Sequence, residues 1–147
     1  MAGHALTNRV ANPLLRRVLR GPLGRRAGRR LAVLRYRGRR TGEPHELVCQ
    51  YVRDGSTVWI LVGHAEAKTW WRNLRAPADV ELWLAGERRL ARAVAVIGAQ
   101  RPEEAAAGLA GYLAGMPAAR RALGLGPGAG AADVAPAVTL VRADLTP

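Results

Sequence analysis

The sequence has 147 residues, of which 49% are apolar and 23% are charged. This length and composition fit one globular domain, and they exclude intrinsic disorder, a collagen-like chain and a disulfide scaffold. The formal net charge of +12 favours an anionic partner such as nucleic acid, anionic lipid, or a phosphorylated or carboxylated ligand.

The positive charge is concentrated at the start of the chain. Residues 1–42 contain 12 arginines and no acidic residue. Residues 43–147 contain 10 arginines, one lysine and 11 acidic residues, so they carry no net charge. We expect a basic segment over residues 1–30, formed by a helix and a linker, and a folded domain over residues 31–147.

The residue inventory excludes several kinds of site. Cys49 is the only cysteine, so no intrachain disulfide can form, and the three histidines lack the spacing of a helical metal site. No apolar run approaches the length of about 18 residues that a membrane-spanning helix needs. The N-terminus also lacks the apolar core of a secretory signal. We therefore expect a cytoplasmic protein with no metal site.

The first predicted element is a short helix. Asn12-Pro13 can begin it, and Gly21-Pro22 can end it. Its apolar residues fall on one arc and Arg16, Arg17 and Arg20 on the other. The helix either packs on the domain through its apolar face or faces a membrane surface or another anion. A Gly/Arg linker follows over residues 25–30.

Six strands are predicted after the linker, joined mostly by short turns. They cover residues 31–36, 46–53, 57–62, 80–84, 88–97 and 137–142. Asp54-Gly55 is a strong hairpin signal, and the strand after it is apolar on both faces, which is typical of a central strand. Helices are predicted over residues 66–74 and 102–123, the second interrupted at Pro117. This order favours an antiparallel β-barrel or β-roll over a parallel sheet.

The turn between the first two strands has the composition of an anion site. Residues 38–45 read GRRTGEPH. The guanidinium groups of Arg39 and Arg40, the Thr41 hydroxyl and the free amides of a tight turn can bind a phosphate or a carboxylate. The alternative is a solvated basic turn without a ligand.

A second segment, residues 62–74, reads VGHAEAKTWWRNL. Gly63 permits a ligand to approach the backbone, and the N-terminus of the following helix favours an anion. His64, Lys68 and Thr69 lie nearby. Trp70 and Trp71 point about 100° apart on a helix, so they are expected in different environments.

Read in this order, the segments resemble the deazaflavin-dependent nitroreductase and quinone reductase family, whose members use coenzyme F420. The resemblance covers residues 12–98 well and the last third of the chain loosely. It rests on a G-R-x-[ST]-G-x-P turn, a D-G hairpin, a buried strand and a W-x-x-N-L helix. It implies an α+β, mainly β, split β-barrel fold, similar to flavin-binding proteins of the pyridoxine-phosphate-oxidase type.

The resemblance also implies cofactor-binding residues. Those expected to bind the phosphate and acidic tail come from the turn and the following strand: Arg39, Arg40, Thr41, Gly42 and His45. Leu47 and Val48 are expected to line the groove beside the ring system. Five further cofactor-binding residues are expected after the central strand and on the segment that closes over the cofactor: Gly63, His64, Lys68, Thr69 and Trp70.

The function implied is an F420H2-dependent reductase that transfers a hydride to a quinone, a nitro compound or an activated alkene. The cofactor carries the chemistry, so no side chain is assigned as catalytic. Tyr51, Tyr112 and His45 are candidate proton donors beside solvent. FMN is the weaker cofactor candidate. Tyr112 is the only tyrosine where nitroimidazole-activating members carry several, which argues against that substrate.

Two alternatives stay open. One is a basic split-barrel protein that binds a membrane or nucleic acid without redox activity, and the other is a flavin-binding relative. Nucleic acid is the weaker partner, because no aromatic residue lies among the arginines of residues 1–30 to stack on bases. The partners expected are a small-molecule electron acceptor, a second copy in a homodimer, and a membrane surface contacted by residues 9–30.

Overall fold

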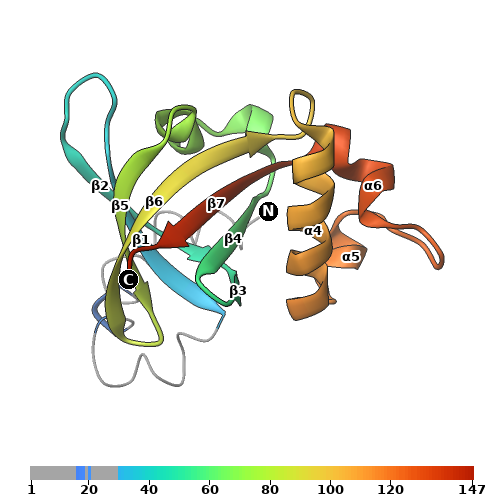
Figure 1. The fold of residues 1–147 in the computed structure, drawn as a ribbon, viewed down its shortest axis with the longest axis horizontal. Coiled ribbons are helices and arrows are strands. Elements are labelled where there is room, and N and C mark those ends of the chain that lie inside the picture. The colour runs from blue at the N-terminus through green and yellow to red at the C-terminus, as the bar shows by residue number, and fades with distance from the viewer. Residues whose placement is uncertain (1–15, 19, 21–29) are drawn as a thin grey trace. The chain divides into compact units, whose positions relative to one another are not determined.

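The computed structural model describes residues 16–18, 20 and 30–147, and its strands and the helices α4, α5 and α6 are labelled in Figure 1. Contacts divide the chain into two compact units. Unit 1 comprises the chain up to Tyr51 with Asp79–Arg92 and Leu145–Pro147, and unit 2 comprises Val52–Ala78 and Ala93–Asp144. The division predicted from charge, at residue 30, stays a prediction.

The described residues form seven strands, one more than expected. They are β1 (Leu31–Arg37), β2 (Pro44–Gln50), β3 (Val52–Asp54), β4 (Thr57–Val62), β5 (Ala78–Leu84), β6 (Glu87–Ile97) and β7 (Thr139–Leu145). Their order in the sheet is β2-β1-β5-β6-β7-β4-β3, and each pair of defined register is antiparallel. The predicted antiparallel, mainly β architecture is therefore confirmed.

The extra strand arises because residues 46–53 do not form one strand, as predicted, but belong to two, β2 and β3. β2 pairs with β1, whereas β3 pairs with β4 across a hairpin in which Gly55 adopts a φ of 62°. Tyr51 lies between them, and its backbone N–H donates to the carbonyl of Arg30 at 3.0 Å. The chain thus changes its pairing partner at Tyr51, although its apolar pattern continues.

In unit 1, β1 is apolar on both faces because it lies between β2 and β5. Ala32 and Leu34 are fully buried on one face. On the other face Val33 lies opposite Val48 of β2 and Trp83 of β5, and Val33 and Val48 form a small buried cluster. The sequence LAVLRYR therefore forms a central strand whose second face is charged only toward its end.

In unit 2, β4 is covered on both sides, as its apolar sequence predicts. Val58, Ile60 and Val62 are buried, and Trp59 packs against a cluster that helix α4 (Pro102–Gly115) supplies together with β6 and β7. Gly108 of α4 lies so close to Trp59 that an added Cβ would be 2.4 Å from the ring. The glycine lets the helix approach the sheet closely.

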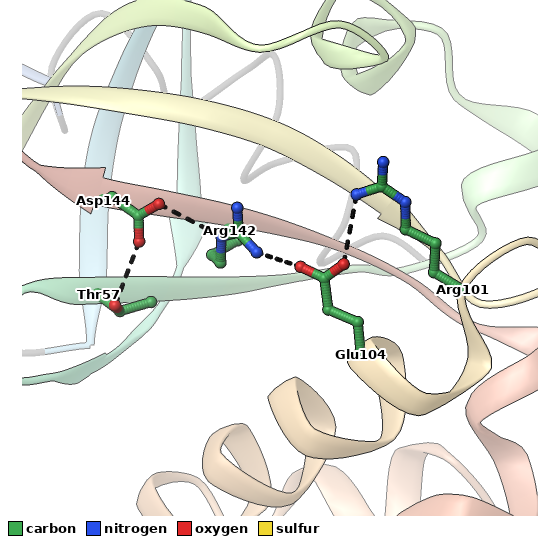
Figure 2. A network of polar contacts seen from close by, with 5 residues as sticks. All are labelled: Thr57, Arg101, Glu104, Arg142 and Asp144. Atoms are coloured by element: carbon green, nitrogen blue, oxygen red, sulfur yellow. Dashed lines mark hydrogen bonds and ion pairs between the residues drawn. The ribbon is translucent and has the colours of Figure 1, made fainter.

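A polar network also fixes α4 (Figure 2). Glu104 of α4 binds Arg101 at 3.3 Å and forms an ion pair with Arg142 of β7. Arg142 Nε lies 3.3 Å from Asp144 Oδ2, and the Thr57 hydroxyl of β4 donates to the other oxygen of Asp144 at 3.2 Å. Alternating charges thus connect the helix to two strands.

The helices differ from expectation in two places. Residues 66–74 form two short 3-10 segments, η2 (Ala65–Ala67) and η3 (Trp70–Leu74), instead of one α-helix. The break predicted at Pro117 is confirmed, because α4 ends at Gly115 and α5 spans Ala119–Ala122. Two unpredicted turns of helix, α6 (Ala131–Val134) and η4 (Ala135–Ala137), precede β7, which begins later than expected.

Near the N-terminus, residues 16–18 and 20 are helical, as predicted. The expected ends of this helix, Asn12-Pro13 and Gly21-Pro22, lie outside the described residues, as does the linker before Arg30. Within the described part of the chain, no helix is long and apolar enough to cross a membrane.

Candidate functional site

The turn from Gly38 to Glu43 is closed by its own backbone. The N–H of Gly38 donates to the carbonyl of Glu43 at 2.9 Å, and the N–H of Gly42 donates to the carbonyl of Gly38 at 2.8 Å. Arg37 Nη1 also donates to the Gly42 carbonyl, at 2.9 Å. These bonds hold the residues between them at the tip of the β1–β2 hairpin.

Two predicted site residues meet over Gly38. A Cβ on this glycine would lie 3.1 Å from Thr41 Oγ1 and 3.3 Å from His45 Nε2. The His45 ring also stacks on Tyr36, with 5.5 Å between the ring centroids. The bare backbone of Gly38 therefore allows a hydroxyl and an imidazole to converge at the base of the turn.

The donors available to an anion differ in part from expectation. The turn was expected to offer free amides, but those of Gly38 and Gly42 are used within it, and the N–H of Glu43 donates to Thr41 Oγ1 at 3.2 Å. The side chains of Arg39 and Arg40 are exposed. Three amides of the turn are thus already used, whereas the guanidinium groups of Arg39 and Arg40 offer donors that suit phosphate and carboxylate oxygens.

Leu47 and Val48 are both buried, with 6% and 0% of their surface exposed. They are neighbours on β2, so their side chains point to opposite faces of the strand. Leu47 lies opposite Leu34 of β1, and Val48 lies opposite Val33 in the small cluster of unit 1. The structure therefore places the two expected groove residues on different faces.

The second predicted group belongs to unit 2, whereas the turn belongs to unit 1. His64 is exposed and has a φ of 52°, a left-handed conformation that costs energy for a residue with a Cβ. It precedes η2, which has three residues in place of the expected longer helix. Lys68, between η2 and η3, is half-buried, and burial lowers the pKa of its ammonium group.

The two adjacent tryptophans occupy different environments, as predicted. Trp71 is 6% exposed, and its indole N–H donates to the carbonyl of Ala65 at 2.8 Å. The guanidinium groups of Arg72 and Arg75 each lie 5.6 Å from its ring. Trp71 thus connects η3 to η2, and half-buried Trp70 is the one that reaches the surface.

The candidate proton donors are not equally accessible. Tyr112 is 2% exposed, and its hydroxyl donates to Met116 Sδ at 3.3 Å. Tyr51 is 5% exposed. His45 is therefore the one of the three that lies at the surface. Within the described residues, no group of three or more His, Cys, Asp or Glu could hold a metal ion.

One polar cluster in unit 1 was not predicted from the sequence. Arg16 and Arg20 both form ion pairs with Glu46, the first at 3.0 Å, and the Arg20 guanidinium lies 4.5 Å from the Trp83 ring. The excess of arginine in residues 1–42 was the only sequence signal of it. The partner, 30 positions along the chain from Arg16, could not be identified from local patterns.

Comparison with known proteins gives a family. The sequence model of the family described as F420H(2)-dependent quinone reductase matches residues 9–109, more than half of the chain. Comparison with the curated proteins gave no match.

Solved structures share the fold at low sequence identity. A structure described as an F420-H2 dependent reductase (FDR-A) has a TM-score of 0.55 and 10% identity, over 79% of this chain and 95% of that one. A structure described as a domain-swapped dimer has a TM-score of 0.57 and 10% sequence identity, over 92% of this chain and 97% of that one. A protein of unknown function from Agrobacterium tumefaciens str. C58 has a TM-score of 0.52 and 17% sequence identity, over 88% of this chain and 58% of that one. These likenesses confirm the predicted split β-barrel class.

Proposed function

Because the chain belongs to the F420H(2)-dependent quinone reductase family, whose reductant is reduced F420, we propose that it transfers a hydride to a small-molecule acceptor. The acceptor classes are a quinone, a nitro compound and an activated alkene. The observation that supports binding of this cofactor is the turn at Gly38–Glu43, which presents two exposed guanidinium groups. Its chemistry fits the phosphate and the acidic tail of the cofactor.

We propose that Arg39, Arg40 and Thr41 hold the phosphate, with His45 beside them. The closed backbone of the turn supports this role, because it fixes where these side chains begin. A guanidinium group donates two parallel hydrogen bonds to an anion, so two arginines on one rigid turn suit a phosphate. Gly42 keeps the turn tight by donating to Gly38.

The remaining predicted contacts are assigned by the family resemblance. Leu47 and Val48 lie on opposite faces of β2, so we propose that only one of the two lies beside the ring system. From unit 2, the proposed contacts are Gly63, His64, Lys68, Thr69 and Trp70. The strained backbone of His64 and the half-buried ammonium group of Lys68 support a binding role for this segment, because such features cluster at functional sites.

When bound, reduced F420 supplies the hydride, and the acceptor also takes up a proton. Of the three candidate proton donors, His45 on β2 is the one at the surface, and solvent can replace it. The chain's own contribution is binding and orientation, which lowers the barrier by holding the reactants together. No catalytic residue is assigned.

Binding is tested by fluorescence titration of the full chain with F420, with FMN as competitor. Arg39→Ala and Arg40→Ala are each expected to weaken F420 binding by about tenfold or more, the typical effect of losing a charge-assisted contact. Arg121→Ala, which removes an exposed arginine of α5 in unit 2, is the matched control and should leave binding unchanged.

Other outcomes of this titration identify the alternatives. Unchanged affinity in both turn variants would reject the site assignment. Tight FMN binding without F420 binding would indicate the flavin-binding relative, and binding of neither would favour the basic binding protein without redox activity. Oxidation of F420H2 by a quinone, a nitroaromatic compound and an activated alkene, followed by absorbance, then ranks the acceptors.

The cellular setting forms part of the proposal. We place the protein in the cytoplasm, with residues 9–30 in contact with a membrane surface, where a lipid quinone would be found. We also propose a homodimer, and sedimentation equilibrium would measure it. One similar solved structure is described as a domain-swapped dimer, which supports testing this state first.

A further inference from the structure

Three arginines of the N-terminal helical segment gather around one carboxylate. Arg16, Arg17 and Arg20, here called the arginine cluster, line a surface pocket together with Glu46 of β2. Glu46 pairs with Arg16 and with Arg20. Within the described part of the chain, no carboxylate pairs with Arg17, which is exposed. One negative charge thus faces three positive charges.

The charged residues of the neighbouring strands do not neutralise the excess positive charge of the arginine cluster. Arg35 of β1 stands directly opposite Glu46 in the register, and Glu81 of β5 stands opposite Arg35 on the other side. Glu81, however, is already bound by Arg88 at 3.0 Å. Burial lowers the pKa of Arg20, the neighbouring guanidinium groups of Arg16 and Arg35 lower it further, and the Glu81 carboxylate opposes these effects only in part. This crowding of like charges is not fully compensated.

The cluster is also pre-organised. The Arg20 guanidinium lies 4.5 Å from the Trp83 ring, so an aromatic face supports its position. Both ion pairs with Glu46 orient two guanidinium groups toward the same place. Pre-organised arginines lose little conformational entropy when an anion binds.

We propose that the arginine cluster binds a phosphate monoester group, at a site separate from the turn that carries Arg39 and Arg40. Three guanidinium groups and one carboxylate leave a charge of +2, which a phosphate monoester, close to a dianion at neutral pH, would neutralise. The phosphate belongs either to a soluble phosphorylated molecule or to a lipid headgroup. The site does not depend on the reductase activity.

The first test is calorimetric titration of the full chain with inorganic phosphate at low salt and neutral pH. Arg17→Gln is expected to weaken binding about tenfold, because it removes a charge-assisted contact and leaves both ion pairs of Glu46 in place. Arg121→Gln makes the same change of charge in unit 2 and should leave binding unchanged. Equal binding by the Arg17→Gln variant and the unaltered chain would overturn the proposal.

A substitution of Glu46 should change phosphate affinity in the opposite direction. Glu46→Gln is expected to tighten phosphate binding several-fold, because it removes the negative charge that competes for two of the guanidinium groups, while the amide oxygen of glutamine can still accept hydrogen bonds that orient them. The matched control is Glu103→Gln on α4, which changes the net charge equally and should have no effect. If Glu46→Gln weakens phosphate binding, the ion pairs serve only to hold the helix, and the proposal is rejected.

A vesicle experiment then distinguishes the two sources of the phosphate. Co-sedimentation is measured with phosphatidylcholine vesicles that contain or lack phosphatidic acid, whose headgroup is a phosphate monoester. Binding that requires phosphatidic acid and falls in Arg17→Gln identifies a lipid headgroup. Binding of inorganic phosphate without vesicle binding identifies a soluble phosphorylated ligand. Absence of binding in both experiments contradicts the site.

Discussion

Arg142 of β7 forms an ion pair with Glu104 of α4, a residue 38 positions away in the sequence. The same carboxylate binds Arg101. Arg142 also forms an ion pair with Asp144, which accepts a hydrogen bond from Thr57. Figure 2 shows that these five side chains form one connected line. The helix and two strands of unit 2 are therefore held together by charges as well as by the apolar cluster beneath them.

Loss of the central carboxylate tests this network. Glu104→Ala should lower the free energy of unfolding by about 1 kcal/mol, because both arginines lose this carboxylate, although Arg142 keeps Asp144 and both arginines remain partly exposed to water. Glu103→Ala is the control, since it removes the neighbouring charge from the same helix turn. Equal effects in urea denaturation would mean that the network contributes nothing beyond the charge at the start of the helix.

Much of the fold was predictable from local patterns. Asp54-Gly55 gives a hairpin because glycine adopts the positive φ that the turn needs. The strand predicted over residues 80–84 lies within β5, where Val80, Leu82 and Leu84 alternate with Glu81 and Trp83 and are buried. The boundary at Tyr51 was not predictable, because the apolar pattern continues through it. Only the choice of pairing partner, which is a long-range property, separates β2 from β3.

The candidate site was predictable to a similar degree. The composition of residues 38–45 correctly indicated a turn with exposed arginines. Convergence of Thr41 and His45 over Gly38 depends on how the hairpin closes, which no residue pattern encodes. Likewise, the composition of residues 66–74 correctly indicated helical structure. These residues form two short 3-10 segments instead of one α-helix, and the indole N–H of Trp71 donates to the carbonyl of Ala65.

Burial makes Cys49 unreactive in the folded protein. It raises the pKa of the thiol to about 12, and the thiolate is the reactive form. At pH 8 the native chain should therefore react with a thiol reagent many times more slowly than the chain in guanidinium chloride, where one thiol per chain should be labelled. Fast labelling of the native protein would show that β2 opens readily.

Acid should weaken the contact between Glu81 and Arg88. A hydrogen bond from Arg88 lowers the pKa of the Glu81 carboxyl below its ordinary value of 4.5, although burial acts in the opposite direction. Because the folded state has the lower pKa, the stabilisation is present above the unfolded value and is lost as the pH falls through the folded value. The stability difference between the unaltered chain and Glu81→Gln should thus shrink in acid.

Urea denaturation from about pH 7 to about pH 3 measures this difference. Glu66→Gln, which removes an exposed carboxylate from η2, serves as the control for the loss of one negative charge. An offset for Glu81→Gln that grows as the pH falls would contradict the assigned direction of the pKa shift.

Two glycines of α4 should respond in opposite ways to the same substitution. At Gly108 an added Cβ would meet the Trp59 ring at 2.4 Å, so Gly108→Ala must displace the helix or the indole. Overpacking of this kind costs about 1–3 kcal/mol. At Gly111 no atom of the described residues, the neighbouring helix backbone aside, lies within 4 Å of the added Cβ, so Gly111→Ala should stabilise the chain by about 0.5–1 kcal/mol through the better helix propensity of alanine. Thermal unfolding of the two variants compares the effects directly, and stabilisation by both would show that α4 does not pack against Trp59 in solution.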